Sequence, residues 1–291
     1  ECVFFQSFAD GGHYQGKGGT RQGIYVVSAG GVLLASLNSL RPDSVLEVLQ
    51  QSLVDYENLP AEQRRRPSGN PSAPSFRWEH LCPKDGLVLE TVVRDLPDND
   101  DPTSPRIRPF NKDHVWFNRE EMNSWLPEDL TVGRSTQLSP DLATRLVRFH
   151  LVDNVRGQTL PFADQEVLQA DITIKVIGQA QDQVQLSIQG ASRAESKGPW
   201  TMDKNLWWVS GEHPRGFRTK IYGEALFDLK SQSFTSFEMI AKGIRWGSSP
   251  INGRGQSKGP SPIATLFRIA GEKSVDRLAP TFIDIYDVDW L

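Results

Sequence analysis

The sequence predicts an α+β protein with a small hairpin-and-helix module at residues 1–66, a linker at 67–75 and a large, curled antiparallel β domain at 76–291. A chain of 291 residues is long enough for two such domains. After residue 150 the chain alternates apolar and polar residues over long runs, a pattern typical of half-buried strands. The clearest apolar stripe at helical spacing lies in the first module, and a linker rich in proline, serine and glycine separates this module from the β domain.

The first module opens with two apolar runs, IYVV and VLLASL, on either side of the turn SAGG, and this order predicts a hairpin. A helix follows, which Asp43 or Ser44 can cap and which Pro60 ends. The apolar stripe of this helix is formed by Val45, Leu46, Val48, Leu49, Leu53 and Tyr56. A helix with such a stripe needs a sheet to cover it.

The segment AEQRRRPSGNPSAPS at 61–75 has the proline, serine and glycine content of an exposed linker. Beyond it, the run from Leu87 to Leu96 predicts a strand. Asn118 followed by Glu121 predicts a capping box at the start of a short helix. Ser139, with proline at the next position, begins another helix.

Two long hairpins dominate the rest of the chain, one at 168–188 and one from Gly216 to Gly247. Further strands are expected at 263–269 and 281–286. Six strands joined mostly by hairpins predict one antiparallel sheet that curls into a partial barrel. Four small residues on the inner face of the second hairpin leave room for something bulky, and we expect the helix after Ser139 or a ligand to fill it. These four are Gly223, Ala225, Ala241 and Gly243.

Composition excludes several classes of function. The net charge of -4 is spread along the chain without a long basic run, so we expect no nucleic-acid partner. No stretch is as long and apolar as a membrane span. Gly11, Gly16 and Lys17 have phosphate-loop spacing, but Gly18 stands where serine or threonine is required, so a glycine loop without a nucleotide is the better interpretation and no cofactor is expected.

The hairpin GIYVVSAGGVLLASLN followed by the helix DSVLEVLQQSLVDYENL resembles the second half of a thioredoxin-like domain, across residues 20–60. This resemblance implies a helix packed on two antiparallel strands. The chain has no Cys-x-x-Cys, so the redox activity of that family is not carried over. The phrase TRQGIYVVSAGGVLLASLNS also resembles exported proteins of bacteria such as planctomycetes, which implies a periplasmic or cell-surface location.

Cys2 and Cys82 are the two cysteines of the chain and permit at most one intrachain disulfide. A bridge between them would tie the first module to the β domain. Two unpaired thiols are the alternative, because sequence does not give geometry.

Metal-ligand side chains occur in WEHLCPKDG and NKDHVWF, which supply His80, Cys82, Asp113 and His114. These are zinc or copper ligand types, but they lack the tight spacing of known metal motifs. The alternative is a pair of hydrogen-bonded loop anchors.

Tryptophan and arginine gather in the segments that bound the large sheet, a composition typical of binding hot spots and of carbohydrate or carboxylate recognition. The candidate ligand-binding residues are Trp207, Trp208, Arg215, Arg218, Arg245 and Trp246, with Trp200, Phe217 and Arg254 nearby. Alternatively, these tryptophans close one end of the sheet. Glu224, Asp228 and Glu238 could approach one another as catalytic carboxylates, but charged residues on the solvent face of a sheet are the commoner explanation.

We therefore expect an exported, non-catalytic binding or scaffold protein whose partner is a protein or a small-molecule or carbohydrate ligand. The first alternative is a thiol-redox or metal-handling protein that uses Cys2 with Cys82, or His80 with His114. The second is a structural protein in which the edge of the curled sheet, or its N-terminal strand, pairs with another copy.

Overall fold

A computed structural model of the chain describes residues 8–15, 22–65, 78–97, 109–198, 200–203, 207–209, 212–249, 251–255, 259–286 and 288–290. The chain divides into two compact units, Glu1–Phe76 and Arg77–Leu291. The division falls beside the expected linker at 67–75, which itself lies outside the described residues.

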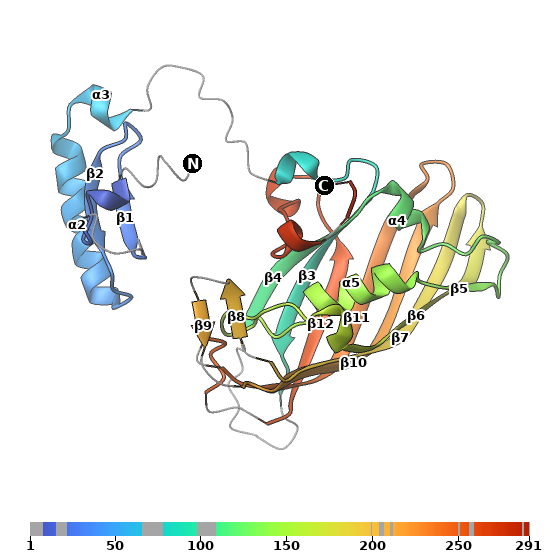
Figure 1. Cartoon of the computed structure of the whole chain (residues 1–291). Coiled ribbons are helices and arrows are strands. Elements are labelled where there is room, and N and C mark those ends of the chain that lie inside the picture. Colours follow the sequence, from blue (N-terminus) through green and yellow to red (C-terminus); the bar gives the residue numbers. More distant parts are fainter. Residues whose placement is uncertain are drawn as a thin grey trace. The chain divides into compact units, whose positions relative to one another are not determined.

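The first unit contains the hairpin β1 (Ile24–Val27) and β2 (Leu33–Leu37), the helix α2 (Pro42–Asn58) and the short helix α3 (Ala61–Arg64), as Figure 1 shows. The strands pair antiparallel, as expected, and α2 packs against β2. The helix begins earlier than Asp43 or Ser44 would place it, because proline occupies its first turn after Arg41. The apolar stripe of α2 remains partly uncovered, with Leu46, Leu49 and Leu53 exposed.

The second unit is built on eight antiparallel strands in the order β4-β3-β12-β11-β10-β7-β6-β5. Both expected long hairpins are confirmed. Their bounds are β6 (Val167–Ala180) with β7 (Gln183–Ser196), and β10 (Arg215–Asp228) with β11 (Ser233–Gly247). The remaining strands of the sheet are β3 (Leu87–Asp95), β4 (Phe110–Phe117), β5 (Ser135–Gln137) and β12 (Ser261–Ile269). A separate two-stranded sheet pairs β8 (Trp200–Asp203) with β9 (Trp207–Val209).

Two helices of the second unit start where the sequence predicts. In α4 (Arg119–Asn123) the capping box is complete, since the Glu121 amide donates to the Asn118 side chain at 2.8 Å and the Asn118 amide donates to the Glu121 carboxylate at 3.1 Å. In α5 (Pro140–His150) the Ser139 hydroxyl accepts from the amide of Leu142. The expected strand at 281–286 is wrong, because that segment contains the short 3-10 helix Ile283–Ile285.

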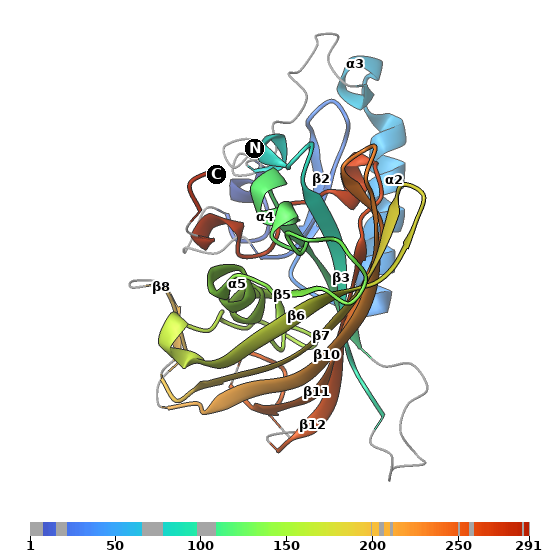
Figure 2. The ribbon, with the colours of Figure 1, turned by 90° about the vertical axis from the view of Figure 1, so that its right-hand side faces the viewer.

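The expectation of a sheet curled into a partial barrel is also wrong. The sheet is open, with β4 and β5 at its two edges. The helix α5 lies across one face of the sheet and contacts β6 and β7, as Figure 2 shows. Its buried residues, including Leu146 and Val147, join the inner residues of the strands in one apolar core. Because a helix fills this face, the strands do not need to close on themselves to bury it.

Two of the four small residues in the second hairpin, Gly223 and Gly243, allow close approach of neighbouring backbone rather than room for a bulky occupant. A Cβ atom added to Gly243 would stand 1.8 Å from the carbonyl oxygen of Arg218, and one added to Gly223 would stand 2.5 Å from that of Glu238. Neighbouring backbone therefore occupies both positions, and glycine permits this close approach of two strands. Ala225 and Ala241 are buried in the core that α5 also enters.

Among the described residues, no helix has the length and apolar character needed to cross a membrane.

We predict that Gly243→Ala lowers the free energy of unfolding by roughly 1–3 kcal/mol, because the new methyl group must displace backbone of the adjacent strand. Gly198→Ala is the matched control, since a Cβ there meets no atom within 4 Å. Urea denaturation of the two variants beside the unmodified chain measures the difference. Equal loss in both variants would contradict the close approach at Gly243.

Candidate functional site

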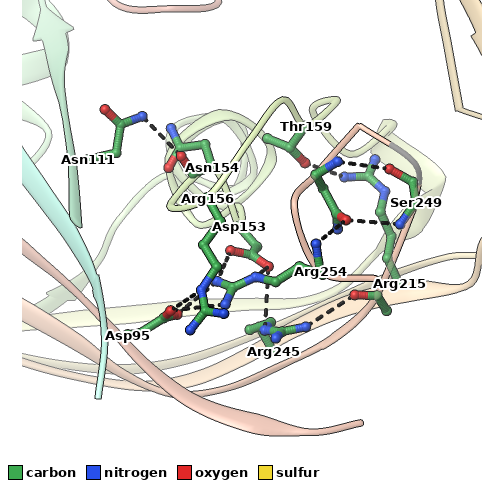
Figure 3. Close-up of polar contacts among 12 residues, drawn as sticks. Asp95, Asn111, Asp153, Asn154, Arg156, Thr159, Arg215, Arg245, Ser249 and Arg254 are labelled. Atoms are coloured by element: carbon green, nitrogen blue, oxygen red, sulfur yellow. Dashed lines mark hydrogen bonds and ion pairs between the residues drawn. The ribbon is translucent and has the colours of Figure 1, made fainter. Parts of the chain in front are cut away.

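A buried cluster of arginines and aspartates lies at one end of the large sheet (Figure 3). Arg254, which is 1% exposed, donates to both carboxylate oxygens of Asp95 at 2.9 and 2.8 Å and to both of Asp153 at 2.9 and 2.6 Å. Asp95 ends β3, Asp153 follows α5, and Arg254 belongs to the loop after β11. One side chain therefore ties three separate parts of the fold together.

Two further arginines complete this cluster. Arg156 donates its Nε to Asp95 at 2.8 Å, and the Nε of Arg245 lies 3.4 Å from Asp153. Arg245 is fully buried and also donates to the carbonyl of Gly247 at 3.1 Å. Burial alone would raise the pKa of Asp95, but hydrogen bonds and charge from Arg254 and Arg156 outweigh it, so its pKa lies below the ordinary value.

The loop that carries Arg254 is held by its own polar residues. The Asn252 side chain accepts from the amide of Ser249 at 2.9 Å and from the amide of Arg254 at 3.2 Å. Both Ser249 and Asn252 are buried. The loop thus presents Arg254 to the aspartates in a fixed conformation.

Arg215 belongs to a neighbouring structural contact. Its guanidinium donates to the carbonyls of Leu160 and Pro161 at 2.5 and 2.8 Å and lies over the ring of Phe162 at 4.4 Å. Burial lowers the pKa of Arg215 to about 10, against the opposing charge of Glu166, so the side chain stays charged at neutral pH. Arg215 and Arg245, two of the expected ligand-binding residues, are both buried and hold the loop after α5 on the sheet, and their role in ligand binding stays a prediction.

Two of the expected binding residues do come together. Arg218 and Trp246 line an open depression of about 390 Å³ with Arg193, Glu195, Ile244 and Pro260. Arg218 is exposed, whereas Trp246 is half-buried and its ring lies against the backbone of Gly216. The depression is on the face of the sheet opposite α5. The backbone of Trp207 and Trp208 forms β9, and their side chains lie outside what the structure describes.

The four expected metal ligands are not brought together. His80 lies in the 3-10 helix Glu79–Leu81 and Cys82 follows it, whereas Asp113 and His114 are neighbours in β4 and point to opposite faces of the sheet. The described residues contain no group of three or more His, Cys, Asp or Glu that could hold a metal ion. The metal hypothesis therefore has no support in the described part of the chain. Cys2 lies outside that part, so its disulfide with Cys82 stays a prediction.

A second buried polar chain, which the sequence did not reveal, joins Tyr286, His150 and Asp113. The hydroxyl of Tyr286 forms a hydrogen bond with the Nε2 of His150, and the Nδ1 of His150 lies 3.7 Å from Asp113. Asp113 also accepts from the amide of Thr281 at 2.9 Å. Burial raises the pKa of Tyr286 well above its ordinary value and lowers that of His150. The hydroxyl of Tyr286 therefore stays protonated and donates a hydrogen bond to the neutral imidazole of His150.

This chain lies beside a groove of about 930 Å³, which runs along α5 and is lined in part by Tyr286. Arg145 forms a bidentate pair with Glu121 there at 2.6 and 2.8 Å, and Trp290 donates to Glu121 at 3.0 Å. Arg145 also lies over the ring of Tyr286 at 5.0 Å. The side chains at the floor of the groove are therefore already engaged with one another.

Of the Tyr286 chain, only Tyr286 lines the groove, and both Tyr286 and His150 are buried. Tyr286 is 3% exposed and His150 is 5% exposed. A general acid or base must lie within hydrogen-bond reach of the substrate atom that it protonates or deprotonates. In this arrangement the chain instead fastens the segment around Tyr286 to β4 and α5.

Comparisons of the sequence with protein families and with curated proteins, and of the structure with solved structures, find no match. The function proposed below therefore rests on the local geometry of the structure.

We predict that Arg254→Ala lowers the free energy of unfolding by about 3–5 kcal/mol, because it leaves the buried carboxylate of Asp95 and the half-buried carboxylate of Asp153 without their main partner. Arg134→Ala is the control: its ion pair with Asp129 is exposed, and its loss should cost at most ~1 kcal/mol. Thermal and urea unfolding of both variants tests this. Similar small losses in the two would show that the Arg254 cluster does not support the fold.

The lowered pKa of His150 predicts a pH dependence of stability. The folded protein keeps His150 neutral, whereas the unfolded chain takes up a proton near the ordinary value of about 6.5. Since the unfolded state binds more protons, stability falls as the pH decreases from about 7 to about 5. Burial lowers the pKa of His114 as well, so it adds to the same slope.

His150→Gln removes the titrating group while retaining a polar side chain. We expect this variant to be less stable at neutral pH, because the contact with Tyr286 changes, but to lose less stability on acidification than the unmodified chain. Urea unfolding at a series of pH values gives both slopes. Parallel slopes would mean that His150 titrates alike in the folded and unfolded states.

Proposed function

We propose that the chain is an exported, non-catalytic binding or scaffold protein that holds a carboxylate-bearing ligand in the depression around Arg218 and Trp246. The observation that carries this proposal is the state of Arg218. Its side chain is exposed and forms no hydrogen bond or ion pair with any described residue. Its guanidinium is therefore available to pair with a carboxylate through two hydrogen bonds.

Trp246 supplies the apolar part of the same site. Its ring rests on Gly216, where a side chain would collide with it. A large, flat and half-buried indole beside a charged fork suits the ring of an acidic sugar, or the stem and carboxylate of an acidic side chain. Arg193 in the same depression already pairs with Glu195 at 2.6 Å, so Arg218 is the better anchor for an anion.

Burial supports the non-catalytic part of the proposal. In the Tyr286 chain and the Arg254 cluster, Tyr286, His150, Asp95, Arg245 and Arg254 are buried, and they hold segments of the second unit together. By contrast, Arg218 is accessible on the open face of the sheet. Such an arrangement suits recognition through surface contacts rather than bond making in an enclosed site.

The location and the identity of the first unit rest on resemblance. Export is supported by the likeness of TRQGIYVVSAGGVLLASLNS to exported bacterial proteins. For the first unit we propose the second half of a thioredoxin-like fold, supported by the order of β1, β2 and α2 and by the exposed apolar residues of α2, which suit a larger sheet. The redox alternative through Cys2 and Cys82 stays a prediction, because Cys2 lies outside the described residues.

We predict that the chain binds oligosaccharides containing glucuronate, or a peptide rich in glutamate, and the two probes are titrated separately by isothermal calorimetry. Arg218→Gln should weaken binding of the effective probe by roughly tenfold or more, because a charge-assisted hydrogen bond is lost. Trp246→Ala should weaken it as well. Lys175→Gln is the matched control, since Lys175 is exposed on the same face but outside the depression.

The two probes distinguish a carbohydrate from a protein as the source of the carboxylate. A chain that binds neither probe, or whose affinity is unchanged by Arg218→Gln, would contradict the proposed site.

A further inference from the structure

The open face of the large sheet, opposite α5, carries three cross-strand rows at its centre. In β10 and β11 the register places Lys220 opposite Lys242, Tyr222 opposite Ile240, and Glu224 opposite Glu238. All six side chains point to the open face, because the alternate residues of both strands are the buried ones. We call these the basic row, the apolar row and the acidic row.

The rows are unfavourable in a single copy of the chain. Like charges directly opposite each other on adjacent strands destabilise a sheet. None of the four charged residues forms an ion pair with a described residue. Between the two charged rows, Tyr222 is 51% exposed and Ile240 is 38% exposed. The center of this face therefore combines like-charge pairs with uncovered apolar surface.

The apolar row extends beyond the hairpin. Leu266 of β12 stands opposite Ile240, and Val92 of β3 stands opposite Leu266. The basic row ends at Ala191 and Ala264, whereas the acidic row continues to Arg268 of β12, which stands opposite Glu238. Arg268 forms its ion pair with Glu90 at 2.9 Å, and Glu90 also pairs with Lys112 at 2.7 Å. The charged residues of these rows that form no ion pair with a described residue therefore lie on β10 and β11, on either side of a longer apolar row.

We propose that a second copy of this chain packs on the open face, related by a two-fold axis that runs along the apolar row between the two sheets. This rotation exchanges the basic and acidic rows. It places Lys220 of one copy opposite Glu224 of the other, and Lys242 opposite Glu238. The apolar row meets its own copy, so Tyr222 faces Tyr222 and Ile240 faces Ile240. An interface of this kind is self-complementary.

The order of residues along the strands favours a second copy over an unrelated partner. Along β10 the outward residues are basic, apolar and acidic, and along β11 they are acidic, apolar and basic. The pattern on this face is therefore its own complement once it is turned over. Sheets that pack face to face lie ~10 Å apart, and the strands of one sheet cross those of the other at about 30°. The two copies would therefore lie closest near the two-fold axis, where these six residues lie.

The contact lies on the same face as the proposed carboxylate site but uses other residues, since Arg218 is the next outward residue of β10 before Lys220. It depends on opposite charges within two copies of one chain. Binding of acidic probes is lost with Arg218→Gln, whereas self-association is lost with reversal of the charged rows, so each proposal fails on its own variants.

Complementary charge reversals test the proposal. Lys220→Glu with Lys242→Glu makes both charged rows acidic, and Glu224→Lys with Glu238→Lys makes both basic. The dissociation constant of the dimer should rise roughly tenfold or more in each double variant, because like charges then face each other across the axis. An equimolar mixture of the two variants should associate again, since acidic rows then face basic rows.

Sedimentation equilibrium of the full chain over a wide range of concentration measures these states, and circular dichroism checks that the exposed substitutions leave the fold intact. The control is Lys84→Glu with Arg119→Glu, which makes the same change in charge at exposed positions off this face and should leave the dimer unchanged. A monomeric unmodified chain at every concentration, a dimer unaffected by either reversal, or failure of the mixture to associate would each overturn the proposal.

Discussion

The pairing of Arg254 with Asp95 and Asp153 determines much of the architecture of the second unit. The three residues come from the loop after β11, the end of β3 and the segment after α5. A buried charge without its partner lowers the stability of the fold, so the position of each of these three segments depends on the other two. The helix is held on the sheet from one end by this cluster and along its length by apolar contacts.

This constraint gives the two faces of the sheet different roles. On the inner face, apolar residues and α5 form the core, and the charged groups near it are paired. Among the described elements of the second unit, neither α4 nor α5 covers the centre of the outer face, where Lys220, Glu224, Glu238 and Lys242 are exposed. Stability therefore comes from the face that is closed. Recognition, whether of a carboxylate or of another copy, is left to the face that is open.

Local patterns account for what the sequence predicted correctly. The two long hairpins, the start of α5 and the capping box of α4 each depend on residues close together in the chain. The Tyr286 chain and the Arg254 cluster were missed because their members are far apart in sequence. His150 and Tyr286 are separated by 136 positions, and Asp95 and Arg254 by 159. Residue types had suggested Arg215 and Arg245 as ligand contacts, but only burial shows that they serve the fold.

The charged rows on the open face could be predicted only in part. The sequence predicted the hairpin that carries these residues, but not the register that places like charges opposite each other. The segments KIYGE and EMIAK are mirror images in chemical character, and an antiparallel hairpin brings such segments into like-with-like register. Repulsion within each row is then a direct result of the fold of one copy. Only a rotation that reverses the strand direction converts it into attraction, and the two-fold axis along the apolar row does this while covering Tyr222 and Ile240. The same pattern that weakens the isolated sheet therefore defines how two sheets can fit together.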